Sequence, residues 1–323
     1  MKKLLKIMLI ALCTILTVLV VFVSSVYVVN LISKEREQGK IEAYGQKVLV
    51  DGKQMNVLIQ GDGKETIVLL PGYGTASPVL DFKPLVKELS PYYRVVVIEP
   101  FGYGLSDDTD KVRTSQNIVD EIHECLQKLN IKKYTLMGHS ISGIYGLEYV
   151  NQYEKEVQAF VGIDTSVPKQ ETDELPVSSL QLLNQSGFYR LLLKVNPDQL
   201  VMPNVDQQTK DQIKMLTFRN FLNESQASEA ENFTNNFKNA ERLHFPKRLP
   251  VVFYLADQTE EETPSWKPMH EELLKNVDHG KVVTFKGGHY LHHTKSKEIA
   301  DDVRGFYRTT SVHVSVLPPQ LLF

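Results

Sequence analysis

Cysteine and tryptophan are scarce in this sequence, and neither sign of charge is in large excess. The 323-residue chain has two cysteines, Cys13 and Cys125, one tryptophan and a formal net charge of −3. Two such cysteines exclude a disulfide framework, and no cysteine–histidine cluster has the spacing of a zinc site. The lack of a basic excess argues against a nucleic-acid-binding protein. A hydrophobic core must therefore hold the fold, and the length suits one large domain of roughly 250–300 residues plus an attachment.

Charge is missing altogether from residues 7–32. A helix of this length, at about 1.5 Å per residue, exceeds the roughly 30 Å hydrocarbon core of a bilayer. The run is longer than the apolar region of a cleaved signal peptide and lacks an A-x-A-like cleavage site. We therefore expect residues 1–33 to form a transmembrane signal-anchor. Because Lys2, Lys3 and Lys6 precede the run, the positive-inside rule places the rest of the protein on the extracytoplasmic side of the cell membrane.

The pattern after a charged linker at residues 34–44 predicts one α/β domain over residues 45–308. A hairpin is predicted at residues 45–60, around the turn Asp51-Gly52. Beyond it, continuous apolar runs typical of strands buried on both faces alternate with helical patterns. The runs cover residues 67–70, 95–98, 160–163, 251–255 and 282–285, and the helical patterns cover residues 80–89, 115–129, 141–153 and 295–307. This alternation indicates a mostly parallel central sheet flanked by helices.

One long stretch interrupts the alternation. Residues from about 166 to 248 contain helical patterns but no clear strand, which predicts a helical cap insertion of the kind that forms lids over sites. The C-terminal tail, residues 309–323, begins with alternating polar and apolar residues. That start is compatible with an edge strand or with a disordered end.

Ser140 lies in the segment MGHSISG, residues 137–143. A serine hydroxyl becomes a nucleophile when a base removes its proton, and a sharp strand-to-helix turn presents it to base and substrate together. Such a turn demands small residues two positions before and two after the serine, and Gly138 and Ser142 meet this demand. The alternative is an ordinary helix-capping serine.

Two further segments could complete a site around Ser140. The apolar strand at residues 67–70 ends in the turn PGYG, residues 71–74. Such a turn can aim backbone N–H groups at a developing oxyanion, and the predicted donors are the amides of Tyr73 and Ile141. The alternative is a tight turn that only requires glycine.

The second segment is GGHYLHH, residues 287–293, which follows the last predicted strand and supplies His289 as the base. The alternative is that His289, His292 and His293 form a surface cluster or a metal site. No carboxylate-bearing companion motif lies nearby, so we predict neither a metal nor another cofactor.

A carboxylate should orient His289 and stabilise its cation. We favour Asp257, which is nearest to the end of the strand at residues 251–255. Glu260 and Glu261 in the same loop are alternatives, and so is Asp164, which ends the preceding core strand.

The motifs LLPGYG, EPFGYGLSD, MGHSISG, LPVVFYLAD and GGHYLHH together resemble those of the α/β-hydrolase superfamily, in its esterase, lipase and prolyl iminopeptidase-like branch. The resemblance covers most of residues 45–308 and implies the α/β-hydrolase fold. It also implies a triad in the order nucleophile, acid, histidine, which Ser140, Asp257 and His289 follow. The G-x-G-x-S turn at residues 102–106 is structural in that family. Serine at the nucleophile position argues against haloalkane dehalogenase or epoxide hydrolase chemistry, which uses aspartate.

Three positions depart from the family pattern. Pro71 replaces the histidine that usually precedes the oxyanion glycine. Ser142 replaces a glycine, which the turn tolerates because it needs only a small residue. Thr259 stands where many relatives carry the triad aspartate, and this departure leaves the identity of the acid open.

The expected function is that of a membrane-anchored serine hydrolase. It would cleave a carboxylic ester, or a related acyl bond, of a small molecule through an acyl-enzyme intermediate. One alternative is a prolyl iminopeptidase-like peptidase, in which cap carboxylates such as Glu224, Glu229 and Glu231 bind a free amino terminus. Another is a non-catalytic binding protein on the same fold.

Overall fold

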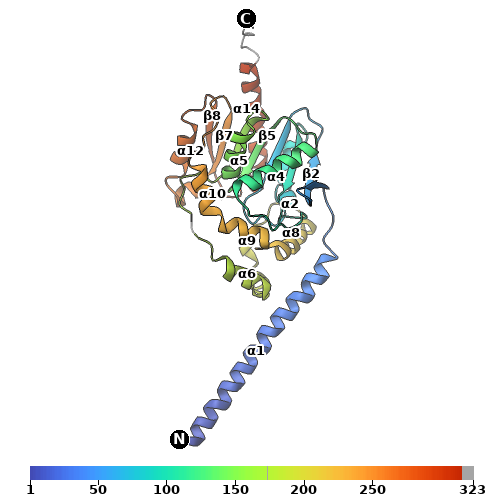
Figure 1. The fold of residues 1–323 in the computed structure, drawn as a ribbon, viewed down its shortest axis with the longest axis vertical. Helices are drawn as coiled ribbons and strands as arrows, with labels where there is room; N and C mark the ends of the chain where they lie inside the picture. Colours follow the sequence, from blue (N-terminus) through green and yellow to red (C-terminus); the bar gives the residue numbers. More distant parts are fainter. Residues whose placement is uncertain (173, 315–323) are drawn as a thin grey trace.

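The central element is an eight-stranded sheet with the strand order β1-β2-β4-β3-β5-β6-β7-β8 (Figure 1). This computed structural model describes residues 1–172 and 174–314, without the side chains of residues 307–314. The strands are β1 (Gln46–Val50), β2 (Lys53–Gln60), β3 (Thr66–Leu70), β4 (Arg94–Glu99), β5 (Tyr134–His139), β6 (Val157–Ile163), β7 (Val251–Ala256) and β8 (Gly280–Phe285). The β1–β2 and β2–β4 pairs are antiparallel and the remaining pairs are parallel. The predicted mostly parallel sheet is confirmed.

Helices cover both faces of the sheet and explain the continuous apolar runs. Alternate residues of β3 enter different cores: Val68 and Leu70 pack on one face, and Ile67 and Leu69 on the other. The first face is covered by α4 (Ser115–Lys128), α5 (Ser142–Gln152) and α12 (Trp266–Leu274), and the second by α2 (Pro78–Asp81), α3 (Lys83–Leu89) and α14 (Ser296–Val314). Each fully buried aliphatic side chain contributes about 1.5–3 kcal/mol relative to exposure.

Some helices differ from the sequence-based expectation. The helix predicted at residues 80–89 is broken at Phe82 into α2 and α3, because Pro84 in the first turn of α3 cannot continue a helix from α2. The acidic segment after β7, expected to be a loop, forms α11 (Asp257–Glu262). Helix α14 runs to Val314, so the start of the tail is helical and forms no edge strand. Residues 315–323 lie outside the described residues.

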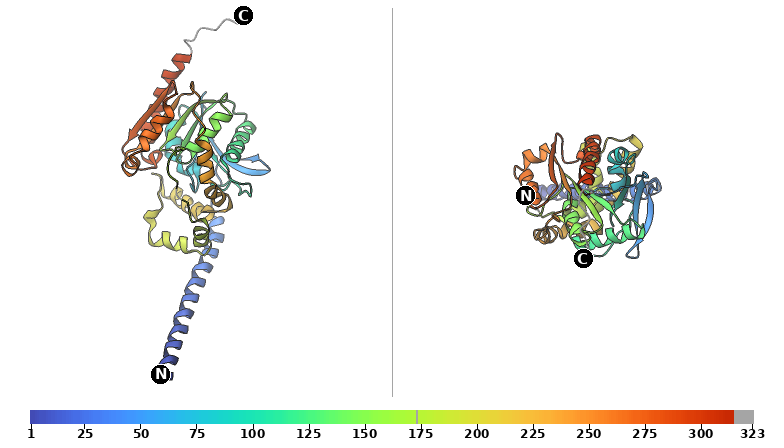
Figure 2. Two further views of the ribbon diagram at one scale, coloured as in Figure 1. Left: turned by 60° about the vertical axis from the view of Figure 1, so that its left-hand side comes forward. Right: turned by 90° about the horizontal axis from the view of Figure 1, so that it is seen from above.

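The cap, residues 166–248, lies between β6 and β7 in the chain. Its helices are α6 (Val177–Gln185), α7 (Phe188–Val195), α8 (Gln207–Asn220), α9 (Glu224–Glu231) and α10 (Phe233–Ala240). The cap packs on turns at the carboxyl ends of the strands: Asn220 Nδ2 donates hydrogen bonds to the carbonyls of Ala76 and Gly104, at 3.1 and 2.9 Å. Figure 2 shows the cap at the end of the body from which α1 emerges.

Helix α1 (Lys2–Gln38) is one continuous helix of 37 residues. Its most apolar 18-residue window has a mean hydropathy of 2.9 and is not buried by the rest of the chain, so the helix is long and apolar enough to cross a membrane. The helix extends past the apolar run, and the first residues of the expected linker are therefore helical.

Candidate active site

Ser140 sits on a strained turn between β5 and α5. Its φ angle is +54°, in the left-handed region that non-glycine residues rarely adopt. A Cβ added at Gly138 would lie 2.8 Å from the Cβ of Ser142, so the turn brings these two positions into contact. The requirement for small residues on both sides of the serine therefore has a steric cause, as the sequence pattern suggested.

The PGYG turn after β3 lies directly against this serine. A Cβ added at Gly72 would lie 2.7 Å from His139 Nδ1 and 3.1 Å from Ser140 Cβ, so a larger residue would have to displace His139. Among the described residues, neither the Tyr73 amide nor the Ile141 amide donates a hydrogen bond to another protein group. Both expected oxyanion donors are therefore available to a ligand at Ser140.

Ser142 does more than fit the turn. Its hydroxyl donates a hydrogen bond of 2.5 Å to the Pro71 carbonyl, and both residues are buried. The side chain that replaces the family's glycine thus connects the start of α5 to the turn that carries the Tyr73 amide. Tyr73 is held from the other side by the cap, because its hydroxyl donates to the Gln226 carbonyl at 3.0 Å and its ring meets Phe233 edge-on.

The partner of His289 is Asp164. His289 Nδ1 donates a hydrogen bond of 2.7 Å to Asp164 Oδ2. Asp164 directly follows β6, is fully buried and has a φ angle of +45°. Its carboxylate also accepts hydrogen bonds from the Ala256 amide (3.0 Å), the Thr259 hydroxyl (2.6 Å) and Trp266 Nε1 (2.9 Å). Burial opposes ionisation of Asp164, but its hydrogen bonds outweigh that effect and hold the pKa below its usual value.

The carboxylates of α11 are directed elsewhere, which corrects the preference for Asp257. Asp257 Oδ1 accepts a hydrogen bond of 2.9 Å from the Gly287 amide and so holds the loop that carries His289. Glu260 accepts from the Thr284 hydroxyl, and Glu261 is exposed. Because β6 and β7 are parallel neighbours, their carboxyl ends meet at one edge of the sheet. Asp164 can therefore fill the place expected for an acid after β7.

His292 and His293 form a buried cluster with Asp81 and are not on the surface. Their Nε2 atoms donate hydrogen bonds of 2.7 Å to the two carboxylate oxygens of Asp81. Burial opposes ionisation of Asp81, yet the two histidines lower its pKa well below the usual value. The three side chains bring potential metal-ligand atoms within 4.8 Å of one another. Since the Nε2 atom of each histidine is already hydrogen bonded to an Asp81 oxygen, these contacts explain the cluster as internal packing.

The serine and histidine segments are tied through His139. Its Nε2 donates a hydrogen bond of 3.1 Å to the His289 carbonyl, and burial lowers the pKa of His139 well below its usual value, so it stays neutral. In the described chain no hydrogen bond joins the Ser140 hydroxyl to His289 Nε2. Such contacts are often long before substrate binds and tighten in the complex.

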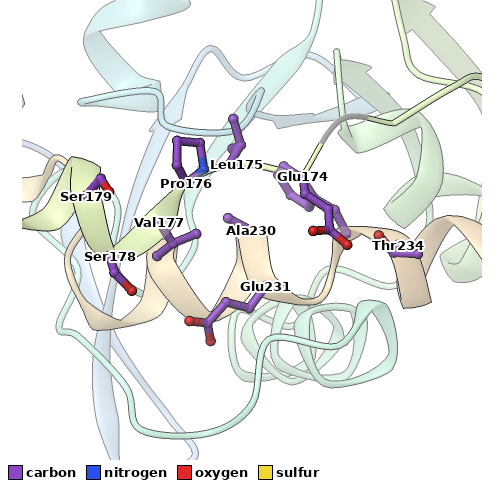
Figure 3. Close-up of a pocket in the computed structure, with 10 residues that line it drawn as sticks. Glu174, Leu175, Pro176, Val177, Ser178, Ser179, Ala230, Glu231 and Thr234 are labelled. Carbon is purple, nitrogen blue, oxygen red and sulfur yellow. The ribbon is translucent and has the colours of Figure 1, made fainter.

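A cavity of about 460 Å³ lies in the cap (Figure 3). It is lined by Glu174, Leu175, Pro176, Val177, Ser178, Ser179, Ala230, Glu231, Phe233 and Thr234. Phe233 also packs on Tyr73, at 4.8 Å between ring centroids, and so connects the cavity wall to the PGYG turn. The cavity has both apolar and acidic walls.

Glu224 and Glu229, the other two carboxylates considered as ligands for an amino terminus, are not among the residues that line this cavity. Glu229 is buried, and its two oxygens accept hydrogen bonds of 2.7 Å from the hydroxyls of Tyr103 and Tyr145. Burial raises the pKa of Glu229 despite these bonds. Glu224 is exposed in the first turn of α9.

The order of the strands and the position of the serine turn agree with a known family. Residues 65–296 match the family profile described as the alpha/beta hydrolase fold. This chain belongs to the α/β-hydrolase family. The resemblance inferred from the five motifs is therefore confirmed.

Three similar proteins illustrate the relationship. The uncharacterized protein YbdG of Bacillus subtilis (strain 168) is 29% identical over 262 residues, 78% of this chain and 81% of that protein. A putative carbamate hydrolase, RutD of Pantoea ananatis, is 32% identical over 106 residues, 32% of this chain and 38% of its own length. The enol-lactonase structure from Burkholderia xenovorans LB400 superposes with a TM-score of 0.60 at 16% identity, over 81% of this chain and 100% of that chain. The α/β-hydrolase relatives thus include hydrolases.

The carboxylate that serves His289 can be tested directly. We expect Asp164→Asn to lower kcat for a p-nitrophenyl ester by about 10⁴-fold, because an amide cannot stabilise the imidazolium and favours the wrong tautomer. Asp257→Asn, which keeps Asp164 on His289, should lose far less. Steady-state kinetics near neutral pH, with circular dichroism as the folding control, measures both variants. A larger loss in Asp257→Asn than in Asp164→Asn would contradict the assignment.

The contact of Ser142 with Pro71 gives a second prediction. Ser142→Ala keeps the small side chain but leaves a buried carbonyl without its donor, so the free energy of unfolding should fall by about 1–3 kcal/mol. The oxyanion turn should also loosen, with a loss in kcat and little change in KM. Ser265→Ala is the control, because Ser265 is exposed and makes no side-chain capping bond. Equal stability and kcat of Ser142→Ala and Ser265→Ala would refute the role of this contact.

Proposed function

We propose that this protein is a membrane-anchored serine hydrolase that cleaves a carboxylic ester or a related acyl bond. The observation that carries the proposal is the Asp164–His289 hydrogen bond beside a serine with positive φ. The free amides of Tyr73 and Ile141 at that serine add support. Each of these features would be needed for nucleophilic attack on a carbonyl.

The reaction would proceed in two halves. His289 takes the proton of Ser140 as the hydroxyl oxygen attacks the substrate carbonyl, and Asp164 stabilises the resulting imidazolium. The amides of Tyr73 and Ile141 donate hydrogen bonds to the oxyanion. Collapse of this intermediate breaks the bond to the leaving group, which receives the proton from His289. A water molecule deprotonated by His289 then attacks the acyl-enzyme and releases the acid and free Ser140.

The cavity in the cap suits the binding of a small molecule next to this chemistry. Its size falls within the range of small-molecule pockets, about 300–1,000 Å³. The apolar walls formed by Leu175, Val177 and Phe233 would hold an acyl or alcohol group. The names of two relatives, an enol-lactonase and a putative carbamate hydrolase, belong to the same broad reaction class.

A prolyl iminopeptidase-like activity is the second candidate. Glu174 and Glu231 line the cavity, and their carboxylates would attract a free amino group. Glu229, in contrast, is fully engaged by two tyrosines. Higher kcat/KM for an amino-acid p-nitroanilide than for uncharged esters, reduced by Glu231→Gln, would favour this candidate over the esterase.

The membrane anchor in this proposal is α1. Its length and hydropathy support a single crossing of the bilayer. Lys2, Lys3 and Lys6 at its start favour a cytoplasmic N-terminus, which would leave the hydrolase domain on the extracytoplasmic side of the cell membrane.

A fluorophosphonate probe tests the nucleophile. The probe should label the full-length protein in detergent, because a triad-activated serine attacks phosphorus as it attacks a carbonyl. Labelling should disappear in Ser140→Ala and persist in Ser265→Ala, measured by in-gel fluorescence. A folded protein that takes up no probe would sink the enzyme proposal and favour a binding protein on this fold.

Protease digestion of intact cells tests the orientation. We expect added protease to degrade the hydrolase domain and to spare an epitope tag placed before Met1. Immunoblotting of the tag and of the domain gives the result, and a cytoplasmic protein serves as the control for cell integrity. Full protection of the domain would reverse the proposed topology.

A further inference from the structure

We propose that the α6–α7 hairpin, residues 175–201 of the cap, lies in the interface of the same membrane that α1 spans. The proposal rests on the anchor in the proposed function and adds a second contact with the bilayer. It is carried by the docking of the hairpin on α1, by the length of the apolar run and by the exposed side chains of the hairpin.

The hairpin is fixed to α1 by a polar contact inside the apolar run. Asn30 is 2% exposed, and its Nδ2 donates hydrogen bonds to the carbonyls of Asn184 (3.3 Å) and Gln185 (3.4 Å). Its Oδ1 accepts one from Arg190 Nε at 3.0 Å. The remaining guanidinium nitrogens of Arg190 bind both carboxylate oxygens of Glu37, at 2.5 and 2.8 Å. A bidentate pair of this kind holds a defined geometry.

The two segments also approach closely. Gly187, between α6 and α7, has a φ angle of +88°, and a Cβ added there would lie 2.6 Å from Asn30 Cβ and 2.9 Å from the Val26 carbonyl. One turn before Val26 in α1, Phe22 packs edge-on against Phe188, with 6.1 Å between the ring centroids. Together with the Arg190–Glu37 pair, these contacts place the hairpin beside residues 22–37 of α1.

The level of this contact sets the position of the hairpin relative to the bilayer. Phe22 lies within the charge-free run of residues 7–32. If the hairpin were wholly in water, only residues 7–21 would remain to cross the bilayer, and they span about 22 Å as a helix. The hydrocarbon core is roughly 30 Å thick. At 1.5 Å per residue, a span of that thickness that starts at residue 7 reaches about residue 26. The hairpin contacts α1 at Phe22, Val26 and Asn30, so it lies where α1 leaves the hydrocarbon core and reaches the interface.

The exposed side chains of the hairpin match that environment. In the part of the chain that the structure describes, eight large apolar residues outside α1 are exposed, and five of them belong to the hairpin. These five are Leu175, Leu182, Leu192, Val195 and Val201. Leu182 and Val195 are 66% and 77% exposed. Such clustering next to a spanning helix is typical of interfacial segments, whereas single exposed apolar residues are ordinary.

Depth-dependent quenching tests the position of the hairpin. Full-length protein carrying a single reactive cysteine would be labelled with an environment-sensitive NBD group and reconstituted in phosphatidylcholine vesicles with doxyl-labelled lipids. The native Cys13 reports on the anchor, and Leu182→Cys and Val195→Cys, in a Cys13→Ser background, report on the hairpin. Val112→Cys, at an apolar position on the α/β body that is 53% exposed, is the control. The buried Cys125 remains in all variants, and the Cys13→Ser protein measures its background labelling.

Quenching of the two hairpin labels to an extent approaching that of Cys13, with none at Val112, is the expected result. A quenched Cys13 label beside unquenched hairpin labels would overturn this inference and leave the anchor intact. An unquenched Cys13 label would remove the anchor and this inference together, while fluorophosphonate labelling of Ser140 reports on the hydrolase separately. The hairpin labels could instead be shielded from water without doxyl quenching, and only at a high ratio of protein to lipid. That result would indicate a contact between copies of the chain and would also overturn the proposal.

Discussion

The active site depends on one buried charge, the carboxylate of Asp164. An ionised carboxylate away from water is costly unless hydrogen bonds satisfy it. Four donors meet this demand, and they come from the end of β7, from α11, from α12 and from the loop that carries His289. The need to hydrogen bond this one carboxylate thus fixes the path of the chain after β7 and the position of His289. The positive φ of Asp164 is part of the same constraint, because the chain turns sharply there to enter the cap.

Two hydrogen bonds explain the residues that depart from the family pattern. Thr259 occupies the position after β7 where many relatives carry the acid, and its hydroxyl donates to the carboxylate of Asp164, which follows β6. Ser142 replaces a glycine, and its hydroxyl binds the carbonyl of Pro71, which itself replaces a histidine. Each of these two hydroxyls therefore donates to a neighbouring oxygen of the candidate site, Thr259 to a carboxylate and Ser142 to a backbone carbonyl. The Asp164 carboxylate and the Pro71 carbonyl are thus both hydrogen bonded, although the surrounding residues differ from the family pattern.

Local patterns predicted the parts of the molecule that local physics determines. The central strands were visible because both faces of the sheet are buried there, and Ser140 and His289 because their turns need small residues and glycines. The carboxylate partner of His289 could not be identified from a local pattern. Asp164 and Asp257 each follow a core strand, and nothing near either one shows which carboxylate His289 meets. That depends on the pairing of β6 with β7 and on the start of α11, which turns Asp257 toward Gly287.

The cap contacts both the PGYG turn of the candidate active site and helix α1. Its segment Leu175 to Val177 forms a wall of the cavity and leads directly into α6, while Phe233 on the other wall packs on Tyr73. The same segment continues into the hairpin that Asn30 and Glu37 hold against α1. Because buried hydrogen bonds and a bidentate ion pair fix this contact, a shift of α1 relative to the body would have to move the cavity wall or break those bonds. In the proposed function, the helix that anchors the chain would therefore also constrain the orientation of the cap over Ser140.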